Sequence, residues 1–198
     1  MSDRRSVALA GHTGDVATAR RGLASPDPGV RVAALGALDR LGVLDDRRLA
    51  AQIDGPDASV RRRAVELAAR RPGIDLSPWL GDPDATVVEM AAWACGEREV
   101  VPAGVLDTLI ELAEGASDAL VREAAVAALG ALGDDRGLDA ILAATTDRPA
   151  IRRRAVLALA PYVDPRHPRA DDVTSALERV KADRDWQVRQ AAEDISPS

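Results

Sequence analysis

Few side chains of this 198-residue sequence are of the types that usually carry out catalysis. The two histidines, His12 and His167, lie near opposite ends of the chain, and Cys95 is the one cysteine. The sequence has no Cys–His pair and no His-rich group at metal-ligand spacing. It also has no glycine-rich dinucleotide motif and no phosphate-binding P-loop. We therefore predict a non-catalytic protein without a cofactor, a metal site or an internal disulfide.

The residues that could recognise a partner are arginines and one tryptophan. Residues 61–63 and 152–154 are two arginine triplets, and Trp93 lies one helical turn after Glu89. Guanidinium groups bind carboxylates and phosphates, and tryptophan is enriched among the residues that dominate binding energy. The triplets could equally be solvated surface, and the arginine excess could reflect codon usage. A net charge of −6 and a single lysine disfavour nucleic acid as the partner.

The elements that must position these side chains are α-helices. Alanine, the best helix former, makes up about a fifth of the chain, whereas phenylalanine is absent and aromatic residues total 2%. The core must therefore be built from Ala, Leu, Val and Ile, which suits close packing of helix on helix. No apolar run approaches the ~20 residues of a membrane-spanning helix, and the N-terminal apolar stretch is too short for a signal peptide. We expect an all-α, cytoplasmic protein without a membrane partner.

A pattern of the form Asp-x-x-Val-Arg-x-x-Ala recurs along the chain. We call its Val or Ile the anchor and number positions from it. The six anchors are Val30, Val60, Val87, Val121, Ile151 and Val188. Their spacings run from about 27 to about 37 residues, which is the period of helical-hairpin repeats.

Each anchor begins one face of a helix, because apolar residues recur at positions 0, +4, +5 and +8. We call these helices the second helices. We expect a first helix before each of them, near residues 15–23, 45–53, 105–114, 137–145 and 171–182, with a short one carrying Pro78 at 76–80.

These registered copies resemble the HEAT repeat in its short, lyase-type bacterial form. The resemblance extends over residues 14–195 and implies an α-solenoid of about six helical hairpins. We expect a single domain over residues 1–198, with repeats near 14–42, 43–72, 73–98, 102–133, 134–163 and 169–195. The motif is architectural, so it indicates fold more strongly than function.

The resemblance also implies a structural role for the recurring charges. In such repeats the turn Asp and the second-helix Arg form a ladder between neighbours. Here the ladder would comprise Asp27, Arg31, Asp57, Arg61, Asp84, Asp118, Arg122, Arg152, Asp185 and Arg189. Val88 replaces the Arg of the third copy, so we expect a gap there.

Positions +2 and +6 of the second helices lie opposite the buried face, where the resemblance implies a concave surface. The candidate partner-binding residues there are Arg62, Glu89, Trp93, Glu123 and Arg153. Trp93 could instead fill a packing defect, and we expect Trp186 to cover the C-terminal end. We predict a monomeric scaffold or adaptor for an unidentified protein or peptide. The alternative is a nucleic-acid-binding protein similar to the solenoid alkylpurine DNA glycosylases, and a phycobilin-lyase activity has no marked chromophore site.

Overall fold

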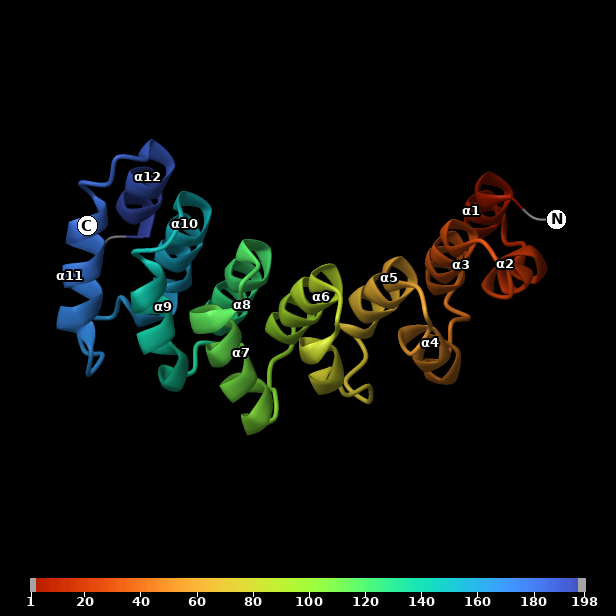
Figure 1. The fold of residues 1–198 in the computed structure, drawn as a ribbon, viewed down its shortest axis with the longest axis horizontal. Helices are drawn as coiled ribbons and strands as arrows, with labels where there is room; N and C mark the ends of the chain where they lie inside the picture. Colours follow the sequence, from red (N-terminus) through yellow and green to blue (C-terminus); the bar gives the residue numbers. More distant parts are fainter. Residues whose placement is uncertain (1–2, 196–198) are drawn as a thin grey trace. The chain divides into compact units, whose positions relative to one another are not determined.

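The computed structural model describes residues 3–195, which form twelve α-helices and three short 3₁₀ helices without a strand (Figure 1). The predicted all-α repeat fold is confirmed. The chain divides into two compact units, one ending at Ala91 and the other beginning at Ala92. The boundary falls inside a helix, α6, and the single-domain organisation stays a prediction. None of the helices in residues 3–195 is both long and apolar enough to cross a membrane.

The first unit contains the N-terminal helices and the start of α6. Its elements are α1 (Arg4–Thr13), α2 (Val16–Leu23), α3 (Pro28–Arg40), α4 (Asp46–Ile53), α5 (Ala58–Ala68), η1 (Ser77–Gly81) and α6 (Ala85–Gly96). The first helix of the third repeat is thus only the 3₁₀ helix η1, which carries Pro78 in its first turn.

The second unit contains the remainder of α6 and three complete helical hairpins. Its elements are α7 (Ala103–Gly115), α8 (Ala119–Leu132), η2 (Asp135–Gly137), α9 (Leu138–Ala144), α10 (Pro149–Ala158), η3 (Ala160–Tyr162), α11 (Ala170–Val180) and α12 (Trp186–Ile195). The second helices α8, α10 and α12 pack against one another in sequence order. The first helices α7, α9 and α11 each pack on the second helix of their own hairpin.

Local sequence fixes where the second helices begin and end. The carboxylate of Asp118 accepts the Leu120 N–H at the start of α8, which satisfies a donor that the helix leaves free. Pro149 stands in the first turn of α10, where its fixed φ angle suits a helix. Gly133 ends α8 with a φ of 61°, a left-handed conformation that other residues rarely adopt.

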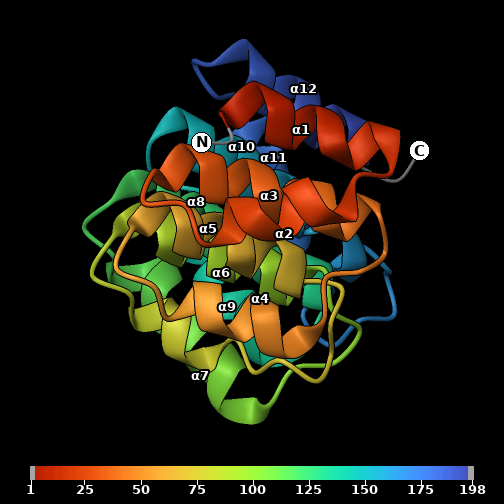
Figure 2. The same cartoon turned by 90° about the vertical axis from the view of Figure 1, so that its right-hand side faces the viewer.

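Helix α1 is an element that the sequence analysis did not predict. It lies beside α3 in both views of the ribbon (Figures 1 and 2). Gly11 allows this approach, because a Cβ there would lie 2.8 Å from the Cα of Ala37. Val7 and Ala10 are buried in the contact. Helix α1 therefore takes the place of a second helix before the first hairpin, although no anchor motif marks it.

The single tyrosine joins two hairpins of the second unit. Tyr162 is buried at the end of η3, and its hydroxyl donates to the carbonyl oxygen of Asp134 at 3.0 Å. Burial raises the pKa of the phenol to about 12. His167 packs edge-on against the ring and lies 3.1 Å from the carboxylate of Asp135 through Nε2. Residues 134–135 and 162–167 are thereby held together.

Candidate functional site

The second-helix arginines of the first unit connect neighbouring repeats. Arg31 of α3 forms an ion pair with Asp57, which precedes α5. Arg61 of α5 donates to Asp82 through Nε at 2.8 Å and through Nη2 at 2.9 Å. This bidentate geometry matches the fork of the guanidinium to the carboxylate and fixes the spacing of the repeats.

The second unit has the same arrangement. Arg122 of α8 donates to both oxygens of Asp147, at 2.8 and 3.2 Å. Arg152 of α10 donates to both oxygens of Asp183, at 2.8 and 2.7 Å. Arg152 is buried with its partner almost fully covered, so this pair is well shielded from solvent.

Each of these arginines also donates hydrogen bonds to carbonyl oxygens of the loop before its own helix. The Nη1 group of Arg31 donates to the carbonyl of Ser25, and that of Arg122 donates to the carbonyl of Ala116, both at 2.7 Å. Arg189 of α12 makes the same bond to the carbonyl of Asp183. The side chain therefore satisfies loop carbonyls within one repeat while it binds a carboxylate of the next repeat.

Most of the turn carboxylates of the expected ladder cap second helices and do not receive an arginine. Asp27, Asp84, Asp118 and Asp185 each accept a backbone N–H at the start of a second helix. Asp57 alone among them receives an arginine and makes no side-chain cap bond. Sequence reasoning missed the other receptors, Asp82, Asp147 and Asp183. A signal for two of them exists, since Asp82 and Asp183 each stand two residues before a capping Asp.

These contacts lower the pKa values of the receiving carboxyls. The bidentate guanidinium of Arg122 holds the pKa of Asp147 below its usual range, and Arg152 does the same for Asp183. Burial by itself would raise the pKa of Asp82, but hydrogen bonds from Arg61 and from the Asp84 N–H outweigh it and the net shift is downward. All three carboxylates are thus held in the charged form.

The arginine series is interrupted in α6. Val88 is buried at the position where the other second helices carry an arginine, so it can supply neither an ion pair nor a bond to a loop carbonyl. The boundary between the two compact units follows three residues later, at Ala91 and Ala92.

The candidate partner-binding residues occupy the second-helix face, which we define as the side chains at positions +2, +3 and +6 from each anchor together with Trp186 at the start of α12. In the first unit, Arg62 of α5 approaches Glu89 of α6, with 3.7 Å between Nη2 and Oε2. In the second unit, Glu123 of α8 approaches Arg154 of α10 at 3.6 Å, rather than Arg153. Trp93 of α6 is 40% exposed, and so it does not fill a closed packing defect.

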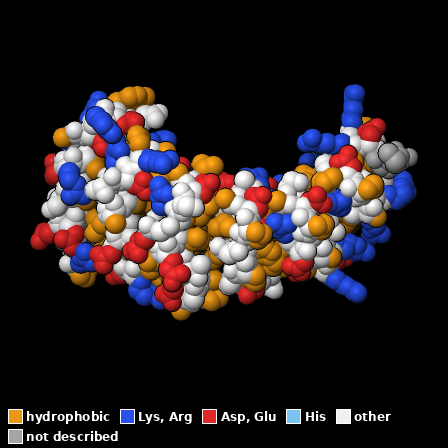
Figure 3. Space-filling model, viewed as in Figure 1, with side chains coloured by type: hydrophobic (Ala, Val, Ile, Leu, Met, Phe, Trp, Pro, Cys, Tyr) orange, Lys and Arg blue, Asp and Glu red, His pale blue; other side chains and the backbone are white. Residues whose placement is uncertain are grey.

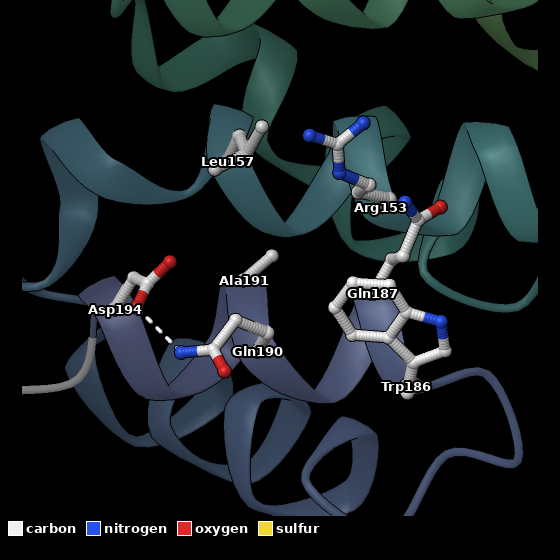
Figure 4. A pocket seen from close by; sticks show the side chains of 7 residues that line it. All are labelled: Arg153, Leu157, Trp186, Gln187, Gln190, Ala191 and Asp194. Atoms are coloured by element: carbon white, nitrogen blue, oxygen red, sulfur yellow. Dashed lines mark hydrogen bonds between the residues drawn. The ribbon is translucent and has the colours of Figure 1, made fainter.

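Arg153 lines a pocket of about 120 Å³ between α10 and α12. Its other lining residues are Leu157, Trp186, Gln187, Gln190, Ala191 and Asp194 (Figure 4). Trp186 is 64% exposed and Leu157 is 37% exposed, so the pocket carries two large apolar side chains open to solvent. Trp186 therefore does not simply cover the end of the repeats, as we expected, but forms part of a groove. Basic and hydrophobic side chains mingle on the surface over α10 and α12 in Figure 3.

Two of the side chains that most often carry out catalysis, Cys95 and His167, are buried or already bonded. Cys95 is buried in α6, and His167 binds Asp135 and accepts the Arg169 N–H. Within residues 3–195, no three His, Cys, Asp or Glu side chains gather as metal ligands would.

Comparison with known proteins identifies the repeat type. A family model described as HEAT repeats matches residues 74–160 and, in an overlapping placement, residues 106–195. No curated protein matches the chain. Similar solved structures include a designed armadillo repeat protein in complex with the peptide (KR)4, with a TM-score of 0.63, 17% identity and 97% of each chain covered.

Two further solved structures are similar. One is a second designed armadillo repeat protein with a TM-score of 0.63 and 18% identity, covering 90% of this chain and 97% of that one. The other is an engineered protein with a TM-score of 0.50 and 20% identity, covering 97% of this chain and 82% of that one. At these identities the likeness concerns the fold alone.

Proposed function

Because this chain belongs to the HEAT-repeat proteins, we propose that it is a non-catalytic scaffold or adaptor that binds a protein or peptide along its second-helix face. The observation that carries the proposal is the exposure of large apolar side chains on that face, with Trp93 in α6 and the pair Leu157 and Trp186 at the α10–α12 pocket. Exposed tryptophans beside charged groups are typical of residues that dominate binding energy. A designed armadillo repeat protein with a similar fold is in complex with a peptide, (KR)4.

The arginine triplets give less support to nucleic acid as the partner. In each triplet the first arginine, Arg61 or Arg152, is committed to a carboxylate of the next repeat. Arg62 and Arg154 also face glutamates on the second-helix face. Phosphate binding needs free cations, and these pairs reduce the number that a nucleic acid could use.

The proposal is tested by affinity capture with purified bait protein followed by binding measurements on each purified candidate. The baits are the wild type, Trp93→Ala, Trp186→Ala and, as a control, Val100→Ala, which removes an exposed apolar side chain outside the second-helix face. We expect a partner that the wild type and the control bind equally and that at least one tryptophan variant binds about tenfold more weakly.

Retention of every specific partner by both tryptophan variants would contradict the proposal. A parallel titration with labelled duplex DNA separates the second class of partner. DNA binding that weakens steeply with salt, and that is lost in Arg62→Glu/Arg153→Glu, would replace the scaffold function by a nucleic-acid function.

A further inference from the structure

The α10–α12 groove has the chemistry to select one class of peptide, and this inference rests on the proposed binding function. Leu157 projects from α10 and Ala191 lies opposite on α12, so the middle of the groove is apolar (Figure 4). The indole of Trp186 extends this apolar surface at one end. A volume of about 120 Å³ is well below the ~300 Å³ of small-molecule sites. The groove therefore suits one large apolar side chain of a peptide.

Arg153 provides an uncompensated positive charge at the Trp186 end of the groove. Among residues 3–195, no carboxylate lies within ion-pair distance of its guanidinium group. The corresponding arginines elsewhere on the second-helix face are compensated, since Arg62 faces Glu89 and Arg154 faces Glu123. Position +2 of α12, where a carboxylate could have faced Arg153, is the neutral Gln190.

The opposite end of the groove is acidic but already engaged. Asp194 accepts a hydrogen bond from the side-chain amide of Gln190 at 2.8 Å (Figure 4). The carboxylate of Asp194 can still accept further hydrogen bonds. It therefore suits an N–H donor of a peptide backbone and would repel a second carboxylate. The groove is thus polarised, with a free cation beside the indole and a carboxylate at the far end. This polarity would orient a bound chain with its own acid toward Arg153.

The rest of the second unit disfavours an acidic partner elsewhere. Acidic side chains are visible on the lower edge of that unit in Figure 3, and the first helices α7, α9 and α11 all carry acidic residues. A peptide carboxylate would be repelled there and attracted to Arg153. From the charge complementarity and the single apolar slot, we infer that the α10–α12 groove binds a peptide segment in which an Asp or Glu side chain adjoins a large apolar one.

Selection from a random dodecapeptide library displayed on phage tests the inference. The immobilised proteins are the wild type, Arg153→Glu and the matched control Arg148→Glu, which makes the same charge change at an exposed arginine outside the groove. We expect the wild type and the control to enrich peptides with an acidic residue next to Leu, Ile, Phe or Trp. Arg153→Glu should instead enrich peptides with Lys or Arg at that place.

A synthetic copy of the leading peptide then gives the magnitude by fluorescence anisotropy. Arg153→Glu should weaken binding by at least about tenfold, Trp186→Ala by a similar factor, and Arg148→Glu by less than about twofold. Circular dichroism is the control for folding. We expect each variant to be folded, because Arg153 and Trp186 are exposed.

Four results would overturn the inference. Enrichment of basic or uncharged peptides by the wild type, or the same peptides by wild type and Arg153→Glu, would leave the scaffold function intact but give the groove a different ligand. A dimer of the wild type in sedimentation equilibrium that Arg153→Glu dissociates would show that a second copy covers the groove. Absence of any enriched peptide would contradict both the inference and the proposed function.

Discussion

Helix α10 contacts a second helix on each side, and the two contacts differ in one respect. Toward α8 the contact is tight, because a Cβ at Gly130 would lie 2.4 Å from the Cβ of Ala158, and the Glu123–Arg154 pair spans the second-helix face. Toward α12 the same face is open and forms the groove of Arg153, Leu157 and Trp186.

The loop end of the repeats is alike on the two sides of α10. Arg122 binds Asp147 on one side, and Arg152 binds Asp183 on the other. Two sets of positions on these helices therefore have separate tasks. The arginine next to the anchor joins consecutive repeats, while the residues at +2, +3 and +6 decide whether the face between them is closed or available to a partner.

The largest effect should come from breaking the shared ion pairs. Arg152→Met leaves the carboxylate of Asp183 nearly buried and without its cation, which should lower the free energy of unfolding by about 3 kcal/mol. Arg122→Met should cost about 2 kcal/mol, because the Arg122–Asp147 pair is somewhat more exposed. Urea denaturation measures both. The exposed Arg166→Met serves as control, and an effect in only one of the two pair variants would show that the loop ends are not equivalent.

A smaller effect should follow from obstructing the tight α8–α10 contact. Gly130→Ala places a methyl group against the backbone of Ala158, so α8 and α10 must separate. We expect a loss of about 1–2 kcal/mol, after the gain in helix propensity is subtracted. Gly104→Ala in α7 is the matched control, since a Cβ there meets nothing within 4 Å, and it should stabilise by about 0.5 kcal/mol. Equal effects of the two substitutions in thermal denaturation would contradict the close approach.

The smallest of the three effects should appear on acidification. The pKa values of Asp147 and Asp183 are lowered in the folded protein, so their contribution is complete above the ordinary carboxyl pKa of about 3.9 and is lost as the pH falls through the folded value. A protonated carboxyl still accepts a hydrogen bond from arginine, which limits the loss. Between pH 5 and pH 3 the wild type should lose more stability than Asp183→Asn. A parallel decline of the two proteins would mean that the ion pair adds nothing to the acid response.

The hairpins were predictable because their signals are local and repeated. The anchor spacing, the capping Asp and the 3.6-residue period each depend on neighbouring residues, and the family match confirms the repeat type. Helix α1 escaped because it lacks an anchor and is placed by a close contact of Gly11 with Ala37. The receptors Asp82 and Asp183 were not predicted, because each of these turns contains two carboxylates. The sequence alone does not say which of the two receives the arginine of the preceding repeat.

The candidate site was predictable only in part. The period placed Arg62, Glu89, Glu123 and Arg153 on one face, but it did not show which of two adjacent arginines pairs with Glu123. Arg154 reaches Glu123 and leaves Arg153 to the groove. Trp186 escaped because it stands at the first residue of α12, where the anchor pattern does not define which surface a side chain joins.

The arginine pairs also bear on how the chain folds. Their partners lie only 21 to 31 residues apart in the sequence, because each pair joins a repeat to the following one. Contacts of such short sequence separation cost little loop-closure entropy, and proteins built from them fold rapidly. A hairpin that forms early therefore offers a surface on which the neighbouring hairpin can pack. Folding can then spread along the chain in either direction. At Val88, folding must spread from one repeat to the next without an arginine ion pair from that position.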